Sequence, residues 1–546
     1  MAGLPIMPAE DGIRKNTQIG FSGYDHRVQS GDGAIWDMIN MSGDKSPILS
    51  PRKPRYKTQK LGRAGGFYTG DGFFWVDYGE LHERDEGFIC SDLMEGEKQF
   101  AALGDYVVIF PDKIYCVKKK SGGQGDMKWK KGTLNCAFND ELSADKFAVF
   151  HKENSIADTK YSVMELPDEY HEFRAGDGVS ITVFSHSQIA GEINIEAIVR
   201  AVEGKYLIFY ENTFLELVGD AEEITVNAAV YRNVPEMDFI CENENRLWGC
   251  KGDTIYASKL GDPFNWNVFD GLSTDSFAVD AGSAGEFTAC FSFMGYPVFF
   301  KEDQIYKVYG SQPANYQVIN SLSLGVQAGS HRSLAVAGER LFYLSRSGVM
   351  CYSGGIPDNL SAAFGELSCH GGVGGSDGIK YYISMIDGDG NPGIFVYDTR
   401  YDLWHREDST RAVAFGFYHG LYFLDDQGII WETGKAAEIG IGWEKEKTVE
   451  SMAEFSDFYE GGPNHLGTAK LQLRLEAEAG SRVEISMQFD SDGEWRLAAQ
   501  LTPQQKRSYY LPIIPRRCDH FRLRIKAKGD WRLYSLTRES YTGSER

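Results

Sequence analysis

The sequence has little of what a helical, membrane-spanning or disulfide-bonded protein requires. No window approaches the run of about 18 apolar residues that a membrane-crossing helix needs. The first ten residues lack the charged start and the long apolar stretch of a signal peptide. The nine cysteines are an odd number without any C-x-x-C pair, and most stand among apolar residues. They are interpreted as small buried side chains of a chain folded in a reducing cytoplasm, not as a disulfide framework or a zinc site.

Helical periodicity is almost absent as well. The best helix candidate is residues 193–202, and its β-branched side chains argue against a helix. What the 546 residues contain instead is 33 Phe, 29 Tyr, 10 Trp and 61 Gly. Aromatic residues favour half-buried strands, and glycine favours tight turns. The composition therefore predicts an all-β protein, and the length indicates about three or four domains.

Positive charge is scarce. The chain has 56 Lys and Arg against 78 Asp and Glu, which gives a formal net charge of −22. This balance argues against a protein that wraps nucleic acid, because such binding neutralises phosphates with Lys and Arg. The simplest interpretation of the acidity is solubility, and a second is a surface past which DNA slides without sticking.

A repeated unit is the strongest signal in the sequence. Each copy has an aromatic-rich strand, a polar turn and a second short strand. The first strands of successive copies begin at Arg246, Tyr296, Arg340, Ile379 and Leu421, in steps of 50, 44, 39 and 42 residues. A period of this length with two central strands per unit is typical of β-propeller blades, which bury their faces against neighbouring blades.

Breaks in this repeat divide the chain. We expect an extended N-terminal arm over 1–66, the first propeller blades over 67–117, an inserted β domain over 118–236, the remaining blades over 237–446 and a C-terminal β-sandwich over 447–546. Alternation of apolar and polar residues in 469–475 and 482–489 indicates the sandwich. The predicted fold class is thus all-β: a β-propeller with an inserted small β domain and a C-terminal β-sandwich.

Motifs for catalysis and cofactors are missing. The sequence has no G-x-S-x-G, no H-E-x-x-H and no phosphate-binding loop of the G-x-x-x-x-G-K-[ST] type. We therefore predict that the chain is not an enzyme and has no catalytic, cofactor-binding or metal-ligating residue. Its scattered histidines, among them His26, His331, His370 and His405, are interpreted as surface or hydrogen-bonded side chains.

Three groups of acidic residues are candidates for chemical sites. Residues 387–392 resemble the start of a calcium loop, but Pro392 stands where that loop needs glycine, so a hairpin turn is favoured over a weak calcium site. The pairs Asp425 with Asp426 and Asp398 with Asp402 could serve a glycosidase. Their positions between predicted strands fit turn formation better.

Two basic clusters stand out in this acidic chain. The candidate protein-contact residues are Arg52, Lys53, Arg55, Lys118, Lys119 and Lys120. The first three belong to the N-terminal arm and are predicted to dock onto another protein. Together with Lys128, Lys130 and Lys131, the other three flank Trp129, an arrangement that could bind nucleic acid by charge and stacking. A solvated loop, or a contact with an acidic neighbouring subunit, is the favoured alternative.

Three segments resemble structural proteins of bacteriophage tails. Residues 38–55, with Met-Ile-Asn-Met-Ser-Gly-Asp and Pro-Ile-Leu-Ser-Pro-Arg-Lys-Pro-Arg, resemble the N-terminal arm of tail or neck proteins. Residues 246–266, Arg-Leu-Trp-Gly-Cys to Asp-Pro-Phe-Asn-Trp, look like a blade of the same group. Residues 511–526 are similar to the C-terminal region of such proteins in phages of Gram-positive bacteria. The family most similar overall is the propeller-containing tail hub, or nozzle, proteins of short-tailed phages.

This resemblance implies a structural virion protein that is assembled in the host cytoplasm and needs neither cofactor nor membrane. Its copies would form a ring, commonly a hexamer, around the DNA exit channel and contact adaptor or portal-proximal proteins and tail fibres. Genomic DNA would pass without specific binding, and we expect part of the surplus Asp and Glu to line the conduit.

Two other functions remain open from the residues. One is a receptor- or carbohydrate-binding tail protein, in which Trp495 or Trp531 stacks on sugar rings. The other is a propeller glycosidase with carboxylates that converge on the central channel.

Overall fold

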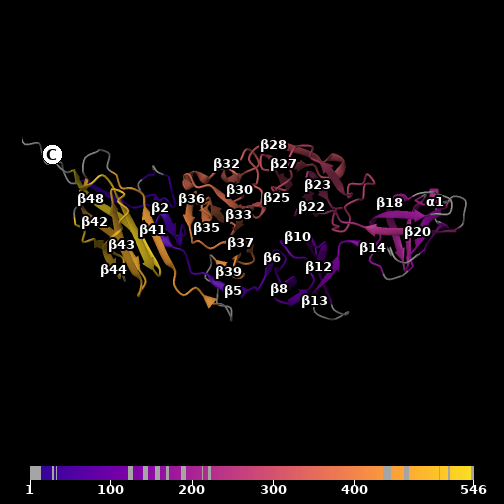
Figure 1. The fold of residues 1–546 in the computed structure, drawn as a ribbon, viewed down its shortest axis with the longest axis horizontal. Coiled ribbons are helices and arrows are strands. Elements are labelled where there is room, and N and C mark those ends of the chain that lie inside the picture. The colour runs from indigo at the N-terminus through magenta and orange to yellow at the C-terminus, as the bar shows by residue number, and fades with distance from the viewer. Residues whose placement is uncertain are drawn as a thin grey trace, which may run out of the picture. The chain divides into compact units, whose positions relative to one another are not determined.

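The computed structural model describes residues 14–27, 30–31, 33–120, 127–138, 146–153, 160–167, 171–185, 192–211, 213–218, 223–433, 444–459, 466–502, 505–514 and 517–542. In this part of the chain the fold is all-β, and the only α-helix is the single turn α1 (Leu215–Val218) (Figure 1). No helix within the same ranges is long and apolar enough to cross a membrane. The chain forms two compact units, residues 63–325 and residues 1–62 with 326–546.

The unit of residues 63–325 contains four blade sheets in its described part, each built of four consecutive antiparallel strands. The first two blades are β6 (Ala64–Thr69), β7 (Phe73–Asp77), β8 (Glu80–Glu83), β9 (Gly87–Cys90), and β10 (Gln99–Leu103), β11 (Tyr106–Phe110), β12 (Ile114–Lys120), β13 (Met127–Thr133). The next two are β21 (Phe239–Asn243), β22 (Arg246–Lys251), β23 (Thr254–Ala257), β24 (Phe277–Asp280), and β25 (Ala289–Phe293), β26 (Tyr296–Phe300), β27 (Gln304–Tyr309), β28 (Gln317–Leu322). A 3₁₀ turn, η1 (Pro313–Asn315), precedes β28.

Aromatic and aliphatic side chains fill the junctions between these blades. Phe74 and Trp129 lie between the first and second blades, with ring centroids 5.0 Å apart. Val108 of the second blade shares a core with Leu247 of the third. Trp248 and Phe299 join the third to the fourth. Each sheet thus buries its faces against its neighbours in the chain, as propeller blades do.

The inserted domain is a sheet that closes on itself. Its strands are β14 (Cys136–Phe138), β15 (Lys146–Glu153), β16 (Lys160–Glu165), β17 (Gly178–Ser185), β18 (Ile193–Glu203), β19 (Tyr206–Glu211) and β20 (Glu223–Arg232). Closure follows because β17 pairs with both β18 and β20. A loop of the third blade holds this sheet, since Asn265 Oδ1 accepts a hydrogen bond of 2.8 Å from the backbone N–H of Gly178.

The described part of the other unit contains three more blade sheets. Their strands are β29 (Ala335–Ala337), β30 (Arg340–Ser345), β31 (Gly348–Tyr352), β32 (Asp358–Asn359); β33 (Cys369–Ser376), β34 (Lys380–Asp387), β35 (Pro392–Asp398), β36 (Leu403–Arg406); and β37 (Ala412–Phe417), β38 (Leu421–Asp425), β39 (Ile429–Thr433). The turns η2 (His331–Ser333) and η3 (Ser361–Phe364) flank the first of them. The last sheet is completed by β5 (Tyr56–Lys60), which lies between β39 and β40 (Glu444–Lys445).

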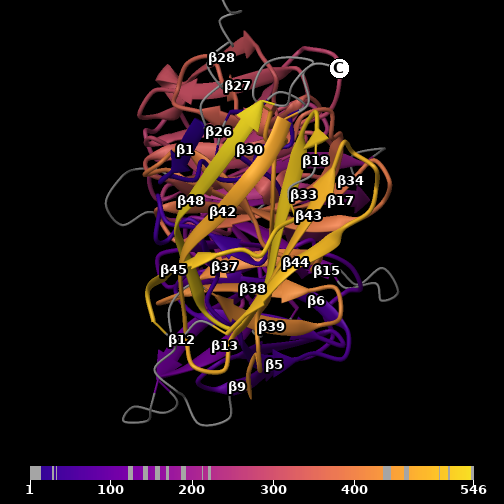
Figure 2. The ribbon, with the colours of Figure 1, turned by 90° about the vertical axis from the view of Figure 1, so that its left-hand side faces the viewer.

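The C-terminal β-sandwich also takes strands from the N-terminal segment. One sheet has β1 (Arg14–Gln18), β48 (Trp531–Thr542), β42 (Leu466–Ala477), β45 (Arg507–Tyr510) and β46 (Arg517–Cys518). The other has β2 (Ile35–Ile39), β41 (Glu450–Phe455), β47 (Phe521–Lys528), β43 (Arg482–Phe489) and β44 (Arg496–Leu501). Figure 2 shows the long yellow strands of this sandwich, with indigo β1 near β48. A short hairpin of β3 (Met41–Ser42) and β4 (Ser50–Pro51) follows β2.

The structure confirms the all-β fold class and corrects parts of the predicted organisation. Residues 1–66 are not an extended arm, because their described strands belong to the sandwich, to the last blade and to the beginning of the first. The inserted sheet spans Cys136 to Arg232 rather than 118–236, since β12 and β13 complete the second blade. β13 has only one buried side chain, Trp129, and therefore showed no alternation. Residues 193–202 lie in β18, so this best helix candidate is a strand.

Candidate functional site

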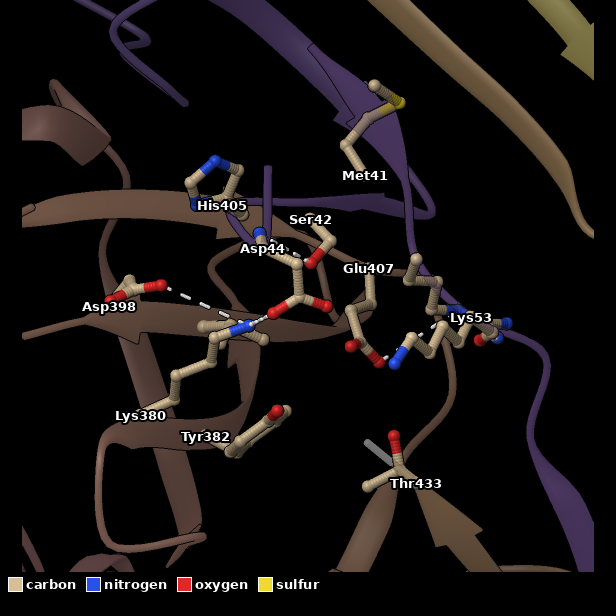
Figure 3. A pocket seen from close by; sticks show the side chains of 13 residues that line it. Met41, Ser42, Asp44, Lys53, Lys380, Tyr382, Asp398, His405, Glu407 and Thr433 are labelled. Atoms are coloured by element: carbon tan, nitrogen blue, oxygen red, sulfur yellow. Dashed lines mark hydrogen bonds and ion pairs between the residues drawn. The ribbon is translucent and has the colours of Figure 1, made fainter. Parts of the chain in front are cut away.

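A small polar cavity lies where the β3–β4 hairpin crosses the sheet of β33–β36 (Figure 3). Its volume is about 20 Å³, which is room for about one water molecule and no organic substrate. Charged side chains from both chain segments line it: Asp44, Arg52, Lys53, Lys380, Asp398 and Glu407. These residues are far apart in the sequence, so the cavity marks a place where the fold itself brings charges together.

Lys380 is the centre of one half of this site. Its ammonium group contacts Asp44 Oδ1 and lies 4.0 Å from Asp398 Oδ2 (Figure 3). Asp398 in turn accepts two hydrogen bonds from the guanidinium group of Arg400, of 2.9 and 2.6 Å. Burial alone would raise the pKa of Asp44, but the charge and the hydrogen bond of Lys380 hold it below its usual range. The pKa of Asp398 is also lowered, because hydrogen bonds from Arg400 and the charge of Lys380 outweigh its burial.

His405 covers the hairpin side of the cavity. A Cβ atom on Gly43 would lie only 2.6 Å from its Cε1 atom, so the ring rests directly on the glycine backbone. Burial, and then the charge of Lys380, lower the pKa of His405 to about 4. Its Nδ1 atom is buried and has no hydrogen-bond partner among the described residues. At neutral pH the ring is therefore uncharged, which suits a site that already contains Lys380.

The other half of the site is a buried arginine cluster. Arg52 binds Glu446 through both of its terminal nitrogens, at 2.7 and 3.0 Å. Arg55 reaches Glu407 at 2.5 Å and Asp408 at 2.8 Å. Both arginines are buried, at 5% and 3% exposure. The prediction that Arg52 and Arg55 dock onto another protein is therefore wrong, because their charges are already neutralised inside the unit.

The ion pairs around the cavity have a structural role. They join the N-terminal segment to the blade of β33–β36 and to the segment that leads into the sandwich. Lys53 is exposed beside the cavity, and its docking role stays a prediction.

The second predicted basic cluster forms an exposed face on the β12–β13 hairpin. Lys119 stands directly opposite Lys128, and Lys130 stands opposite Val117, so the three lysines share one side of the sheet. All three are exposed, and no carboxylate of the described residues pairs with them. Like charges placed opposite each other on a sheet repel. This lysine face, Lys119, Lys128 and Lys130, is therefore suited to an anionic partner.

Trp129 does not belong to this face. It lies on the opposite side of β13, where Lys118 stands above its ring at 5.0 Å and Phe74 packs against it. At 8% exposure it cannot stack on a base, so the proposed nucleic-acid site made of Trp129 and its flanking lysines is wrong in its stacking part. Lys118 is exposed, and the side chain of Lys120 lies outside the described residues.

Asp387 and Asp425, which belong to the acidic groups proposed from the sequence, form turns. Asp387 Oδ1 accepts hydrogen bonds from the backbone N–H groups of Asp389 and Asn391, so it closes the β34–β35 hairpin. Asp425 accepts the backbone N–H groups of Gln427 and Ile429 at the turn between β38 and β39. The turn interpretation of both is confirmed.

Trp495 and Trp531, the candidates for stacking on sugar rings, are not free exposed rings. Trp531 is fully buried in the sandwich core, and its Nε1–H donates to Ser451 Oγ at 2.8 Å. The guanidinium group of Arg524 lies over the ring of Trp495 at 3.7 Å. Trp531 therefore offers no surface to a sugar, and Trp495 already has a cation on one face.

Comparison with known proteins finds distant similarity to solved structures, one of which is a β-propeller domain. No family model and no curated protein matches the chain. The β-propeller domain of the Trilobed protease from Pyrococcus furiosus is 10% identical and covers 60% of this chain and 90% of its own, with a TM-score of 0.25. An exo-β-1,3-galactanase from Phanerochaete chrysosporium is 9% identical over 54% of this chain and 92% of its own, with a TM-score of 0.20. Hsv2 from Kluyveromyces marxianus is 10% identical over 66% and 92%, with a TM-score of 0.24.

These comparisons correct the prediction that the chain is not an enzyme. That prediction depended on missing motifs, and the similar structures include a galactanase and a domain of a protease. At 9–10% identity the likeness concerns the fold alone and assigns no activity.

Proposed function

We propose that this chain is a structural protein of a bacteriophage tail, of the hub or nozzle type, whose copies assemble into a ring around the DNA exit channel. The proposal joins the resemblance of residues 38–55, 246–266 and 511–526 to tail proteins with one feature of the surface. That feature is the lysine face of the β12–β13 hairpin.

The lysine face carries the proposal because it needs an acidic partner, and the chain itself has a large excess of acidic residues. Lys119, Lys128 and Lys130 have no acidic partner among the described residues, whereas the whole chain has a net charge of −22. The acidic surface of a second copy would neutralise the three lysines and relieve their mutual repulsion. Such a contact joins two different surface patches, so repeating it around an axis gives a ring when the rotation between successive copies closes.

The segment with the most specific resemblance supports the same architecture. Residues 246–266 include Phe264 and Trp266, which are buried between the second and third blades, and Asn265, which holds the inserted sheet. This loop fixes an additional domain at the rim of the third blade, where it is available for contacts with neighbouring subunits or tail fibres.

The test is the assembly state of the purified protein. We expect mass photometry to show a concentration-dependent oligomer and negative-stain electron microscopy to show rings. Changing Lys119→Glu, Lys128→Glu and Lys130→Glu together should weaken association about tenfold or more, because three reversed contacts of about 0.5 kcal/mol each exceed the 1.4 kcal/mol of one decade.

The matched control reverses three other exposed lysines, Lys60→Glu, Lys447→Glu and Lys526→Glu, which alters the net charge equally. This variant should assemble nearly as the unmodified chain does. A protein that stays monomeric at every concentration, or a control that dissociates as far as the hairpin variant, would contradict the proposal.

A further inference from the structure

Thiol groups meet at two of the blade junctions in the 63–325 unit. Cys90 of β9 and Cys116 of β12 belong to one buried cluster between the first and second blades, and each thiol affects the pKa of the other. At the junction of the third and fourth blades, Cys290 of β25 lies in one buried cluster with Cys241 and Cys250. All five are free thiols. Two thiols that meet between two sheets can be oxidised to a disulfide, whereas a single buried cysteine has no second thiol to pair with.

The junction that contains Cys90 and Cys116 is held tightly in place. Cys116 stands opposite Lys131 on β13, and Lys131 Nζ donates a hydrogen bond of 3.1 Å to the carbonyl oxygen of Ser91, the residue after Cys90. The backbone N–H of Trp129 donates to Glu86 Oε2 of the first blade at 2.9 Å. The two sulfur atoms are therefore positioned by contacts on both sides of them.

The two thiols differ in access and in acidity. Cys90 keeps 7% exposure, whereas Cys116 is fully buried. The hydrogen bond from Cys116 and the charge of Lys131 lower the pKa of Cys90 in spite of its burial, while the same hydrogen bond and burial raise the pKa of Cys116. Cys90 is thus the more acidic of the two thiols, and the thiolate is the form that reacts with oxidants.

We propose that Cys90 and Cys116 form a redox modification site, which a peroxide converts into a disulfide between the first two blades. The Cys90 thiolate attacks one peroxide oxygen, the O–O bond breaks, and Cys90 becomes a sulfenic acid as hydroxide leaves. The sulfur of Cys116 then attacks the sulfur of Cys90, and its thiol proton leaves with the departing hydroxyl as water. Two thiols are oxidised by two electrons, and one hydrogen peroxide is reduced to two waters.

The cysteines of the other junction serve as an internal comparison. The hydrogen bond to Cys290 and burial raise the pKa of Cys241 well above the ordinary value, and burial and the hydrogen bond to Cys250 do the same for Cys290. Neither becomes a thiolate near neutral pH, so the same oxidant should modify them much more slowly.

The experiment treats the folded full-length protein with a small excess of hydrogen peroxide at neutral pH. We expect intact mass spectrometry to show the loss of two hydrogen atoms, and non-reducing peptide mapping to find the peptides of Cys90 and Cys116 joined. A thiol reductant should restore the original mass. The oxidised protein should also melt at a higher temperature than the reduced one, because the new bond closes a loop across two blades.

The control variants are Cys116→Ser and Cys351→Ser, the second being a buried cysteine outside both thiol groups. Cys116→Ser should lose the cross-link and leave Cys90 as sulfenic acid or a higher oxide, whereas Cys351→Ser should behave as the unmodified chain. An unmodified chain that gains only oxygen atoms, or that joins Cys241 to Cys290 first, overturns the proposal even if a variant does not fold.

Discussion

At the scale of residues, the charged side chains of the polar cavity affect how stability responds to acid. The pKa of His405 is lowered to about 4 from an ordinary value of 6.5. The unfolded chain therefore binds a proton at this ring between about pH 6.5 and pH 4, and the folded chain does not. The contribution of the neutral His405 ring to the stability of the folded chain is therefore fully present above pH 6.5 and is lost as the pH falls through that window.

We predict that His405→Asn makes the free energy of unfolding less dependent on pH between 6.5 and 4. The shift of His405 corresponds to about 3 kcal/mol over the whole window, because one pKa unit is worth about 1.4 kcal/mol. Urea denaturation at several pH values measures this directly. His419→Asn is the matched control, since His419 is exposed and has a positive φ that Asn tolerates. An unchanged slope in His405→Asn would show that the ring is already protonated in the folded chain.

The arginine cluster shows what sequence reading can and cannot find at this scale. Arg52 and Arg55 stand in a locally basic stretch, so the sequence suggested an exposed docking site. Their partners Glu407 and Glu446 follow more than 350 residues later, which no local pattern connects. Lys119 and Lys128 lie in one hairpin, so the local basic pattern located an exposed cluster there, whose role as a protein contact stays a prediction.

At the scale of elements, the periodic pattern located the central strands of the blades. The predicted starts Arg246, Tyr296, Arg340 and Leu421 are the first residues of β22, β26, β30 and β38. These are second strands in which all but one side chain at most is buried, so they give the strongest apolar signal. The fourth strand β28 has no fully buried residue and could not be recognised in this way. Nor could β5, whose partner strand comes from the other end of the blade series.

We predict that β5 is essential to the last blade and that Lys57→Pro tests it. Lys57 has strand neighbours on both sides, Trp431 of β39 and Glu444 of β40, so proline removes a ladder hydrogen bond whichever strand its N–H faces. The free energy of unfolding of this unit should fall by about 2 kcal/mol or more beyond the effect of Lys57→Ala. Lys57→Ala loses the same side-chain contacts and keeps the N–H. Equal denaturation midpoints for the two variants would mean that the ladder does not depend on β5.

At the scale of the whole molecule, the charge distribution separates two possible partners of the lysine face. A net charge of −22 repels duplex DNA, whereas three lysines on one hairpin could attract it locally. We predict that the purified protein does not retain duplex DNA at physiological ionic strength, as measured by fluorescence anisotropy over a range of salt concentrations. Retention that disappears when Lys119, Lys128 and Lys130 are changed to Glu would instead identify the hairpin as a nucleic-acid site.

The threading of the N-terminal segment has a consequence for biosynthesis. Thr17 in β1 hydrogen-bonds Thr537 in β48, a separation of 520 residues, and β5 must wait for β39. Ribosomes add about 5–20 residues per second, so the first strands exist for tens of seconds before their partners are made. The blades of residues 63–325 are complete long before that moment. The sandwich and the last blade can therefore form only after β48 and β39 have been made, and a nascent chain interrupted before that point keeps unpaired strand edges exposed to aggregation.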